Sequence, residues 1–583
     1  MRIVSLMALA AVLCVGCVFD SGPAPERPRS TARTSNEATS KRERLSAAAL
    51  GQRVDWSKRR LVEVSGPDGR ARLEFLAPGE ILFLGPRRMP YLYRGKKRIV
   101  WEFVAPTLIV NGLVLGVAVD RPLDERSVRL VEKHSGSIKA IRLSGLRGIR
   151  PQKLLEALKR LKTTRLMVQL ETSALHPEEV RHLAELGGRV RALWLLGEIR
   201  KAHLQALAKL PNLNTLGLLA RGTDDRRLAH LPELASLSNL SVMGQPVGDH
   251  GLARIVKNTG IATLDLSGTL VTDDGLKALS QLPQLTSLVV SRTRVSDQGL
   301  ARIGTLAQLE RLVLMMTRVT DAGLQPLAKL RRLRVLRLRL TDVRGTGLTA
   351  LRDLRGLIQL GLSDTKVGRL GLRAVQDLPR LRWLAINNTL SGDRALKAVG
   401  RLTMLVWLDV SDSVCSGQGL SQLASLQSLR HLSFSGNVVA PASLAALGRL
   451  KELRHLALSG THIRDADLVH LSTLTNLRRL DLSRNLVTDA GLAALGSLSS
   501  LQDLNLAVTR VTGSGLIHLS KAVGLERLSL KRTLVTDAAL NQLARFERLR
   551  RVDLRNTSVT AEGAARLRTA LPKATVANRV GLR

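Results

Sequence analysis

The hydrophobic residues of this chain recur in a fixed pattern, which is clear in "LRRLDLSRNLVTDAGLAALGSL" at residues 477–498. In its first half Leu480 and Leu482 alternate with polar residues, the period of two that is typical of a short, half-buried strand. In its second half leucines follow at a spacing of three from Leu492 onward, which places them on one face of a helix or 3₁₀ segment. The pattern predicts a strand, a bend and a helical return, with Leu492 buried in the core.

The bend between strand and helical return holds residues with separate predicted roles. Val487 returns one more side chain to the core, and Thr488 with Asp489 supplies side-chain acceptors for the free N–H groups of the helix start. Gly491 occupies a position that is mostly glycine when the repeats described below are aligned, and we call such a set of equivalent positions a column. We expect a small residue in this column to let neighbouring turns approach closely.

The motif of residues 477–498 repeats along most of the chain, and each turn starts 24 residues after the one before it. Thirteen turns follow one another without an insertion or deletion. Two more keep the register upstream, and looser turns occupy residues 138–146, 165–173 and 192–198, which makes about eighteen turns in all. The polar residue that follows each strand marks the thirteen turns at Thr269, Thr293, Thr317, Thr341, Thr365, Thr389, Ser413, Asn437, Thr461, Asn485, Thr509, Thr533 and Thr557.

This pattern resembles the leucine-rich repeat family, L-x-x-L-x-L-x-x-N-x-L, and in particular its bacterial 24-residue variety, T-x-V-T-D-x-G-L. The resemblance covers residues 138–571. It implies an α/β solenoid, a right-handed horseshoe or arc in which stacked turns bury leucines that no single turn could bury. The chain departs from the family in the Asn column, which is mostly Thr here, and we expect the Thr hydroxyl to hydrogen-bond the backbone of the neighbouring turn instead.

The first residues are apolar, and "IVSLMALAAVLCV" has about the length of a signal-peptide core. The sequence "CVGC" then places small Gly16 before Cys17, which resembles the lipobox of bacterial lipoproteins. The resemblance implies a signal peptide at residues 1–16 and a diacylated Cys17. Cys14 stands where that pattern prefers Leu. The alternatives are an ordinary signal peptide of a periplasmic or secreted protein and, more remotely, a cytoplasmic protein.

The remaining segments divide by composition. Residues 17–45 are rich in Pro, Ser, Thr and charge, which predicts a disordered tether. Residues 46–135 predict a small β-rich domain or cap, because "RLVEVSGPDGRARLEFL" indicates two strands around a Gly-Pro-Asp-Gly turn. The repeats are assigned to residues 136–571, and the C-terminal tail at 572–583 can add one last strand.

The charge of the chain is one-sided, with 89 Lys+Arg against 48 Asp+Glu and a formal net charge of +41. Such a field attracts polyanions such as acidic glycans, lipid head groups and nucleic acid, although an Arg-rich composition can also follow from a genome's base composition. The segment "GPRRMPYLYRGKKRIVWEF" at residues 85–103 mixes cations with aromatics, as sites for single-stranded nucleic acid do. We favour a β-hairpin with charged edges there, and nucleic acid is not an expected partner.

Motifs for catalysis are absent from the sequence, which has no H-E-x-x-H, no G-x-S-x-G, no P-loop and no dinucleotide-binding glycine pattern. Cys415 lies in a column otherwise filled mostly by Val, so we interpret it as a small core hydrophobe. The chain is therefore expected to be no enzyme and to hold no metal and no cofactor.

The residue before the first leucine of each strand should lie on the concave face of the sheet. Trp383, Trp407, His431 and His455 occupy this column on four successive turns, although aromatics make up only 2% of the chain. Stacked turns lie about 4.8 Å apart, so the four side chains should form one strip of about 15 Å. Its indole faces would suit a peptide or a few sugar rings.

Charged residues flank this strip on the same predicted face. Arg311, Arg337 and Arg339 lie upstream, where they could orient an acidic group of a ligand, and Asp409 lies beside Trp407. The two histidines would add a pH-dependent charge if their pKa values stay near the usual value of about 6.5.

These features predict a non-catalytic binding module of the bacterial cell envelope, lipid-anchored at the outer membrane or cell surface. Its concave face would recognise a protein or a glycan. An alternative is adhesin-like binding of polyanions through the positive charge, which steep salt dependence would indicate. A remote alternative is an enzyme with its site in residues 46–135.

Overall fold

The computed structural model describes residues 183–186, 188–368, 371–440 and 443–578, and upstream of these only short strands. The chain divides into two compact units, residues 1–294 and 295–583. Both units are built from the same turn, in which a strand is followed by a bend and a short helical segment. This is the α/β leucine-rich-repeat solenoid that the sequence predicts.

The first unit holds a parallel sheet in which each strand pairs with the next one along the chain. Strands β7, β8 and β9 confirm the three looser turns predicted upstream of the regular ones. The strands are β6 (Ala118–Val119), β7 (Ala140–Leu143), β8 (Arg165–Glu171), β9 (Val190–Glu198), β10 (Thr215–Arg221), β11 (Asn239–Ser241), β12 (Thr263–Asp265) and β13 (Ser287–Val289). The helical segments are η4 (Leu183–Leu186), α5 (Lys201–Ala206), η5 (Leu207–Lys209), α6 (Asp225–Leu228), α7 (Asp249–Ile255) and η6 (Gly275–Gln281).

Short strands also occur in the predicted β-rich region. Strands β2 (Leu61–Gly66) and β3 (Gly69–Glu74) pair antiparallel, as the sequence predicts, and β1 (Glu43–Ser46) adds to β2 in parallel. Strands β4 (Tyr93–Arg94) and β5 (Lys97–Arg98) pair antiparallel, which confirms a hairpin within the cationic, aromatic segment. The predicted signal peptide, Cys17 and nearly all of the tether lie outside the described residues.

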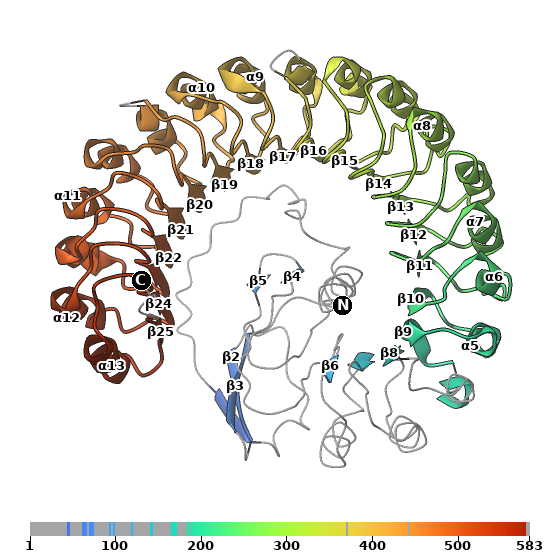
Figure 1. Cartoon of the computed structure of the whole chain (residues 1–583), viewed down its shortest axis with the longest axis horizontal. Coiled ribbons are helices and arrows are strands. Elements are labelled where there is room, and N and C mark those ends of the chain that lie inside the picture. Colours follow the sequence, from blue (N-terminus) through green and yellow to red (C-terminus); the bar gives the residue numbers. More distant parts are fainter. Residues whose placement is uncertain are drawn as a thin grey trace, which may run out of the picture. The chain divides into compact units, whose positions relative to one another are not determined.

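The second unit carries its strands on the inner, concave side and its helical segments on the outer side (Figure 1). Strand β25 lies in the predicted C-terminal tail and pairs with β24, which confirms the expected last strand. The strands are β14 (Arg311–Val313), β15 (Val335–Arg337), β16 (Gln359–Gly361), β17 (Trp383–Ala385), β18 (Trp407–Asp409), β19 (His431–Ser433), β20 (His455–Ala457), β21 (Arg479–Asp481), β22 (Asp503–Asn505), β23 (Arg527–Ser529), β24 (Arg551–Asp553) and β25 (Thr575–Ala577). The helical segments are α8 (Asp297–Ile303), η7 (Ala322–Lys329), η8 (Thr346–Asp353), η9 (Gly371–Asp377), α9 (Gly392–Val399), α10 (Gly417–Ser421), η10 (Gln422–Ser425), η11 (Ser443–Arg449), η12 (Asp465–Leu471), α11 (Asp489–Leu492), η13 (Ala493–Leu495), η14 (Ser514–Lys521), η15 (Asp537–Ala539), α12 (Leu540–Ala544) and α13 (Ala561–Ala570).

The core of each turn is formed by its leucine columns. Leu480, Leu482 and Leu492 are all buried, with Leu492 fully inaccessible to solvent. Cys415 is buried as well, and burial raises the pKa of its thiol to about 12. It therefore packs as a core side chain and is not a poised nucleophile.

An Asp column joins successive turns at the start of the helical segments. The Thr488 N–H donates to Asp465 Oδ1 at 2.8 Å, and the Thr488 hydroxyl donates to Asp465 Oδ2 at 2.5 Å. Gly491 lies against the same carboxylate, and a Cβ at this glycine would clash with Asp465 Oδ1. The predicted need for a small residue in this column is confirmed, and its cause is the carboxylate of the preceding turn.

The predicted N-cap pair at residues 488 and 489 performs two different tasks. Thr488 caps the helix, because its hydroxyl accepts a hydrogen bond from the Ala490 N–H. Asp489 reaches forward to the next turn, where it accepts from the N–H groups of Thr512, Gly513 and Gly515. The Asp column thus stabilises the stacking of turns and the helix start together.

The Thr column differs from the expectation. The Thr509 hydroxyl donates to the Leu506 carbonyl of its own turn at 2.7 Å, and most threonines of the column do the same three residues back. The Asn485 amide instead donates to the Leu458 carbonyl of the preceding turn, and its oxygen accepts from the Thr461 and Ile463 N–H groups. Among the hydroxyls of the column, that of Ser413 does bond the preceding turn, because it donates to the Ile386 carbonyl at 2.8 Å. No helix that the structure describes is both long and apolar enough to cross a membrane.

Candidate binding site on the inner sheet face

Four ring-bearing side chains lie in register on the inner face of the second unit. Trp383, Trp407, His431 and His455 begin strands β17 to β20, and the strand pairing places each one opposite the next. All four are half-buried, whereas the leucine that follows each one in its strand is buried. The predicted strip is confirmed as an arrangement of side chains, and we call these four residues the aromatic strip.

Each ring of the aromatic strip contacts the next, and the first three are stacked. The Trp383 and Trp407 ring centroids lie 4.5 Å apart with planes 12° from parallel, and those of Trp407 and His431 lie 5.1 Å apart at 14°. His431 and His455 meet edge to face at 5.4 Å. Both faces of the Trp407 indole are therefore covered by neighbouring rings. The expectation that indole faces would receive a ligand is wrong here, because the strip presents its ring edges.

Arg337 closes the upstream end of the aromatic strip. Its guanidinium carbon lies 5.0 Å from the Trp383 ring centroid, a cation–π contact. It reaches Trp383 across Gly361, which has no side chain to fill the space between them. The Arg337 Nη2 donates to Gln359 Oε1 at 3.3 Å, while its Nε is buried without a hydrogen-bond partner. Burial lowers the pKa of this guanidinium, so the cation is one that an added anion would stabilise.

The two histidines of the strip are uncharged at neutral pH. Burial is the main cause that lowers the pKa of His431 to about 4, and the charge of His455 adds to it. Burial likewise lowers the pKa of His455 to about 4, with nearby Arg479 as the next cause. Their Nδ1 atoms lie 3.2 Å apart, so one imidazole donates to the other. The expected charge change near pH 6.5 is therefore wrong for both residues.

The other predicted charged residues are placed differently. Arg339 donates from its Nε to Asp364 Oδ2 at 2.6 Å, so its charge is already paired. Arg311 starts β14, two strands before Gln359 and three before Trp383. Asp409 is half-buried at the end of β18. Burial raises the pKa of its carboxyl, and hydrogen bonds from Ser411 offset this only in part. Of the three arginines predicted to flank the strip, Arg337 is the one that contacts it.

A cavity of about 460 Å³ adjoins the histidine end of the strip on the same face. His431 and His455 line it together with Arg479, Arg527 and Arg551 and with three aspartates of strands β21, β22 and β24. Arg527 Nε donates to Asp503 Oδ2 at 2.9 Å, so part of this charge is paired internally. The sequence column that contains the strip also contains these arginines, but nothing in the column indicates a cavity.

The described residues include no cluster of three or more His, Cys, Asp or Glu side chains placed to hold a metal ion.

Comparison with known families agrees with the geometry of the turn. A family model described as a leucine-rich repeat region matches residues 318–571, and a second, described as a leucine-rich repeat, matches residues 257–280. These residues are thus leucine-rich repeats by pattern and by structure. None of the curated proteins matches the sequence.

Similar solved structures include bacterial repeat proteins. An internalin from Listeria monocytogenes strain 4b F2365 is 19% identical over 57% of this chain and 89% of its own, with a TM-score of 0.46. A leucine-rich-repeat protein from Leptospira interrogans is 18% identical over 73% of this chain and 98% of its own, with a TM-score of 0.47.

Proposed function

We propose that this chain is a non-catalytic binding module whose inner sheet face takes a segment of a protein partner along the aromatic strip. The observation that carries the proposal is the row of four half-buried rings in contact at register positions of successive strands. Half-buried aromatic side chains on a rigid sheet are the residues that most often dominate the energy of protein interfaces.

A protein partner fits the strip better than a glycan. Sugar rings bind Trp by lying on the indole face, and both faces of Trp407 are covered by Trp383 and His431. Ring edges remain, and these suit side chains and backbone groups of a polypeptide. The uncharged histidines add imidazole donors or acceptors at the downstream end.

Apolar side chains on the bend extend this surface in the same turns. Leu390, Val414 and Val438 each follow a strip residue by seven positions, and they are 69%, 74% and 56% exposed. Large exposed apolar residues in adjacent turns are typical of protein contact surfaces. The partner is therefore proposed to contact the ring edges on the sheet and these three side chains on the bend.

The proposed partner carries an acidic group at the upstream end of the strip. Arg337 is stacked on Trp383 and has no carboxylate within ion-pair distance among the described residues. The cavity at the other end is charge-balanced, because three arginines and three aspartates line it. This balance favours a protein segment over a polyanion on the inner face.

The proposed setting is the bacterial cell envelope, with Cys17 as the site of lipid attachment. Support for this comes from the apolar run, Gly16 and Cys17 of the sequence. The second candidate function, polyanion binding, is favoured by a cationic hollow on the outer side of the second unit, between η8 and η9.

The test uses the double variant Trp383→Ala with Trp407→Ala. The full chain and the variant are immobilised and exposed to envelope extract, and captured proteins are identified and titrated. We expect the double variant to lose binding by at least about tenfold, as for residues that dominate an interface. A matched control is Thr263→Ala with Val335→Ala, two half-buried residues of the same column outside the strip. A partner that binds the Trp variant as tightly as the parent would refute the proposed site.

A further inference from the structure

The start of the helical segments carries an Arg and no Asp in two successive turns. Five of the thirteen regular turns carry Thr or Ser followed by Asp here, as in Thr488–Asp489, where the Asp bonds the next turn. The sequence instead reads "VRGTGL" at residues 343–348 and "VGRLGL" at residues 367–372. At the positions equivalent to Thr488 and Asp489 these turns have Arg344–Gly345 and residues 368–369, Gly-Arg. Both turns therefore lack the carboxylate that would bond the next turn, and both have an Arg at one of the two positions.

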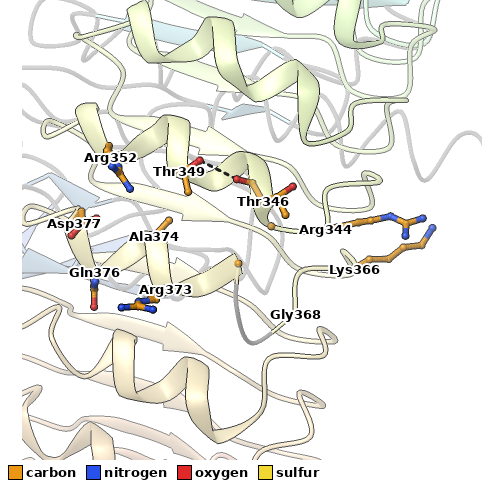
Figure 2. A pocket seen from close by; sticks show the side chains of 12 residues that line it. Arg344, Thr346, Thr349, Arg352, Lys366, Gly368, Arg373, Ala374, Gln376 and Asp377 are labelled. Atoms are coloured by element: carbon orange, nitrogen blue, oxygen red, sulfur yellow. Dashed lines mark hydrogen bonds between the residues drawn. The ribbon is translucent and has the colours of Figure 1, made fainter.

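A hollow of about 680 Å³ lies at this place on the outer side, between η8 and η9 (Figure 2). Figure 2 shows Arg344 and Lys366 extending together from the bends that precede the two segments, while Arg352 and Arg373 lie on the helical side of the hollow. Thr346 and Thr349 stand between these two groups. We call this space the outer hollow.

The outer hollow has an excess of positive charge. Its lining contains four cations, Arg344, Arg352, Lys366 and Arg373, against one carboxylate, Asp377. Lys366 is paired with Asp342 at 2.8 Å.

Three of these cations, Arg344, Arg352 and Arg373, form no ion pair with any residue that the structure describes. The charge of Arg344 acts on the Asp342 carboxylate, whereas Arg352 and Arg373 have no such acid among the described residues. The nearby Asp321 carboxylate accepts from the N–H groups of Arg344, Gly345 and Gly347, so its charge is already satisfied by backbone donors. Two guanidinium groups are thus left to meet a ligand.

We propose that the outer hollow binds a phosphate or sulfate ester on a small, non-aromatic carrier such as a sugar. Guanidinium groups bind oxyanions by paired, charge-assisted hydrogen bonds, and the ammonium of Lys366 and the hydroxyl of Thr346 supply further donors. The volume is that of a small-molecule site. The lining contains no aromatic side chain on which a nucleobase could stack, so a single-stranded nucleic acid is not the ligand. This site lies on the opposite side of the turn from the aromatic strip and does not depend on the proposed protein partner.

The experiment titrates the full chain with inorganic phosphate and inorganic sulfate at low ionic strength by calorimetry, with chloride as the reference anion. The variant is Arg352→Gln with Arg373→Gln. The control is Arg545→Gln with Arg548→Gln, which removes the same charge from exposed positions near α12, away from the hollow. We expect saturable oxyanion binding to weaken about tenfold or more in the first variant and to stay unchanged in the second. Equal weakening in both variants would show a diffuse charge effect and overturn the site, as would the absence of saturable binding to the parent.

Competition then separates the sources of the oxyanion. A sulfated oligosaccharide that displaces phosphate from the parent, and fails to bind the Arg352→Gln, Arg373→Gln variant, would identify an ester on a sugar. Failure of the oligosaccharide to displace phosphate would restrict the ligand to the free oxyanion. A single-stranded oligonucleotide that binds the hollow more tightly than the oligosaccharide would contradict the proposed ligand class.

Discussion

At the residue scale, one position of each turn holds the chain in a left-handed backbone conformation. It is the residue before the Thr column, with φ of 66° at Gly268, 52° at Asn388 and 59° at Val508. Gly and Asn adopt this conformation at little cost, whereas a β-branched residue is strained in it. The turn therefore demands a conformation to which its sequence is only partly adapted.

Val508→Asn should stabilise the protein, because Asn tolerates the left-handed region better than Val. Val508 is 43% exposed, so little packing is lost, and its N–H bond to the Lys531 carbonyl is kept. We expect the free energy of unfolding of that region to rise by about 0.5–1 kcal/mol, measured by urea denaturation. Val523→Asn, at an exposed position without positive φ, is the control and should give no gain. A loss of stability in Val508→Asn would contradict the strain argument.

The histidine pair should make the fold less stable in acid. The folded pKa values of His431 and His455 are about 4, below the ordinary value of 6.5. Between about pH 6.5 and 4 the unfolded chain therefore binds more protons than the folded one, and the free energy of unfolding falls as the pH is lowered through this window. The charges that face the pair, Arg454, Arg478 and Arg479, act in the same direction.

This pH dependence can be measured by thermal unfolding at pH 7, 5.5 and 4. The variant His431→Gln with His455→Gln should show a smaller drop in midpoint over this range than the parent chain. Parallel curves for the two proteins would show that the imidazoles do not contribute.

At the scale of the element, each turn is stable only because the next one covers it. Leu492 is fully buried in α11, and the start of α11 is held by the Asp465 carboxylate of the preceding turn. Stability in such arrays is roughly a sum of turns and of interfaces between neighbours. Damage to one turn should therefore begin locally.

Leu492→Ala should cost about 2–5 kcal/mol, because it leaves a cavity in a well-packed core. Hydrogen exchange should rise first in the turn of residues 477–498 and in its direct neighbours. Ala490→Ser, an exposed position of the same segment, is the control and should leave exchange unchanged. A uniform rise of exchange across residues 188–578 would be incompatible with stability that depends on nearest neighbours.

At the scale of the whole molecule, the proposed place of action rests on one side chain. The apolar run before Gly16 and Cys17 predicts that a bacterial host attaches lipid to Cys17. Growth with radiolabelled palmitate should label the full chain and leave Cys17→Ala unlabelled. Equal labelling of the two proteins, or none of either, would remove the predicted lipid anchor.

The turn itself could be predicted from the linear pattern. A spacing of 24 residues without a slip defines the register of every strand, and the alternation in "LDLSRNLV" assigns each side chain to core or surface. For this reason the repeat pattern alone places Trp383, Trp407, His431 and His455 in one strip. The close approach at the glycine column could be predicted for the same reason. A residue type that recurs at one position of successive turns indicates a contact that each turn makes with the adjacent turn.

The chemistry of the site could not be predicted in this way. A column shows that two indoles are neighbours, but the 4.5 Å stack that covers their faces depends on rotamers chosen by packing. The pKa values near 4 of the two histidines depend on burial and on arginines from neighbouring strands, neither of which enters the ordinary value of 6.5. The outer hollow arises where Arg352 and Arg373, from different turns, line one space in which cations outnumber carboxylates. Such properties depend on distances between side chains far apart in the sequence, so they arise only when the turns are stacked.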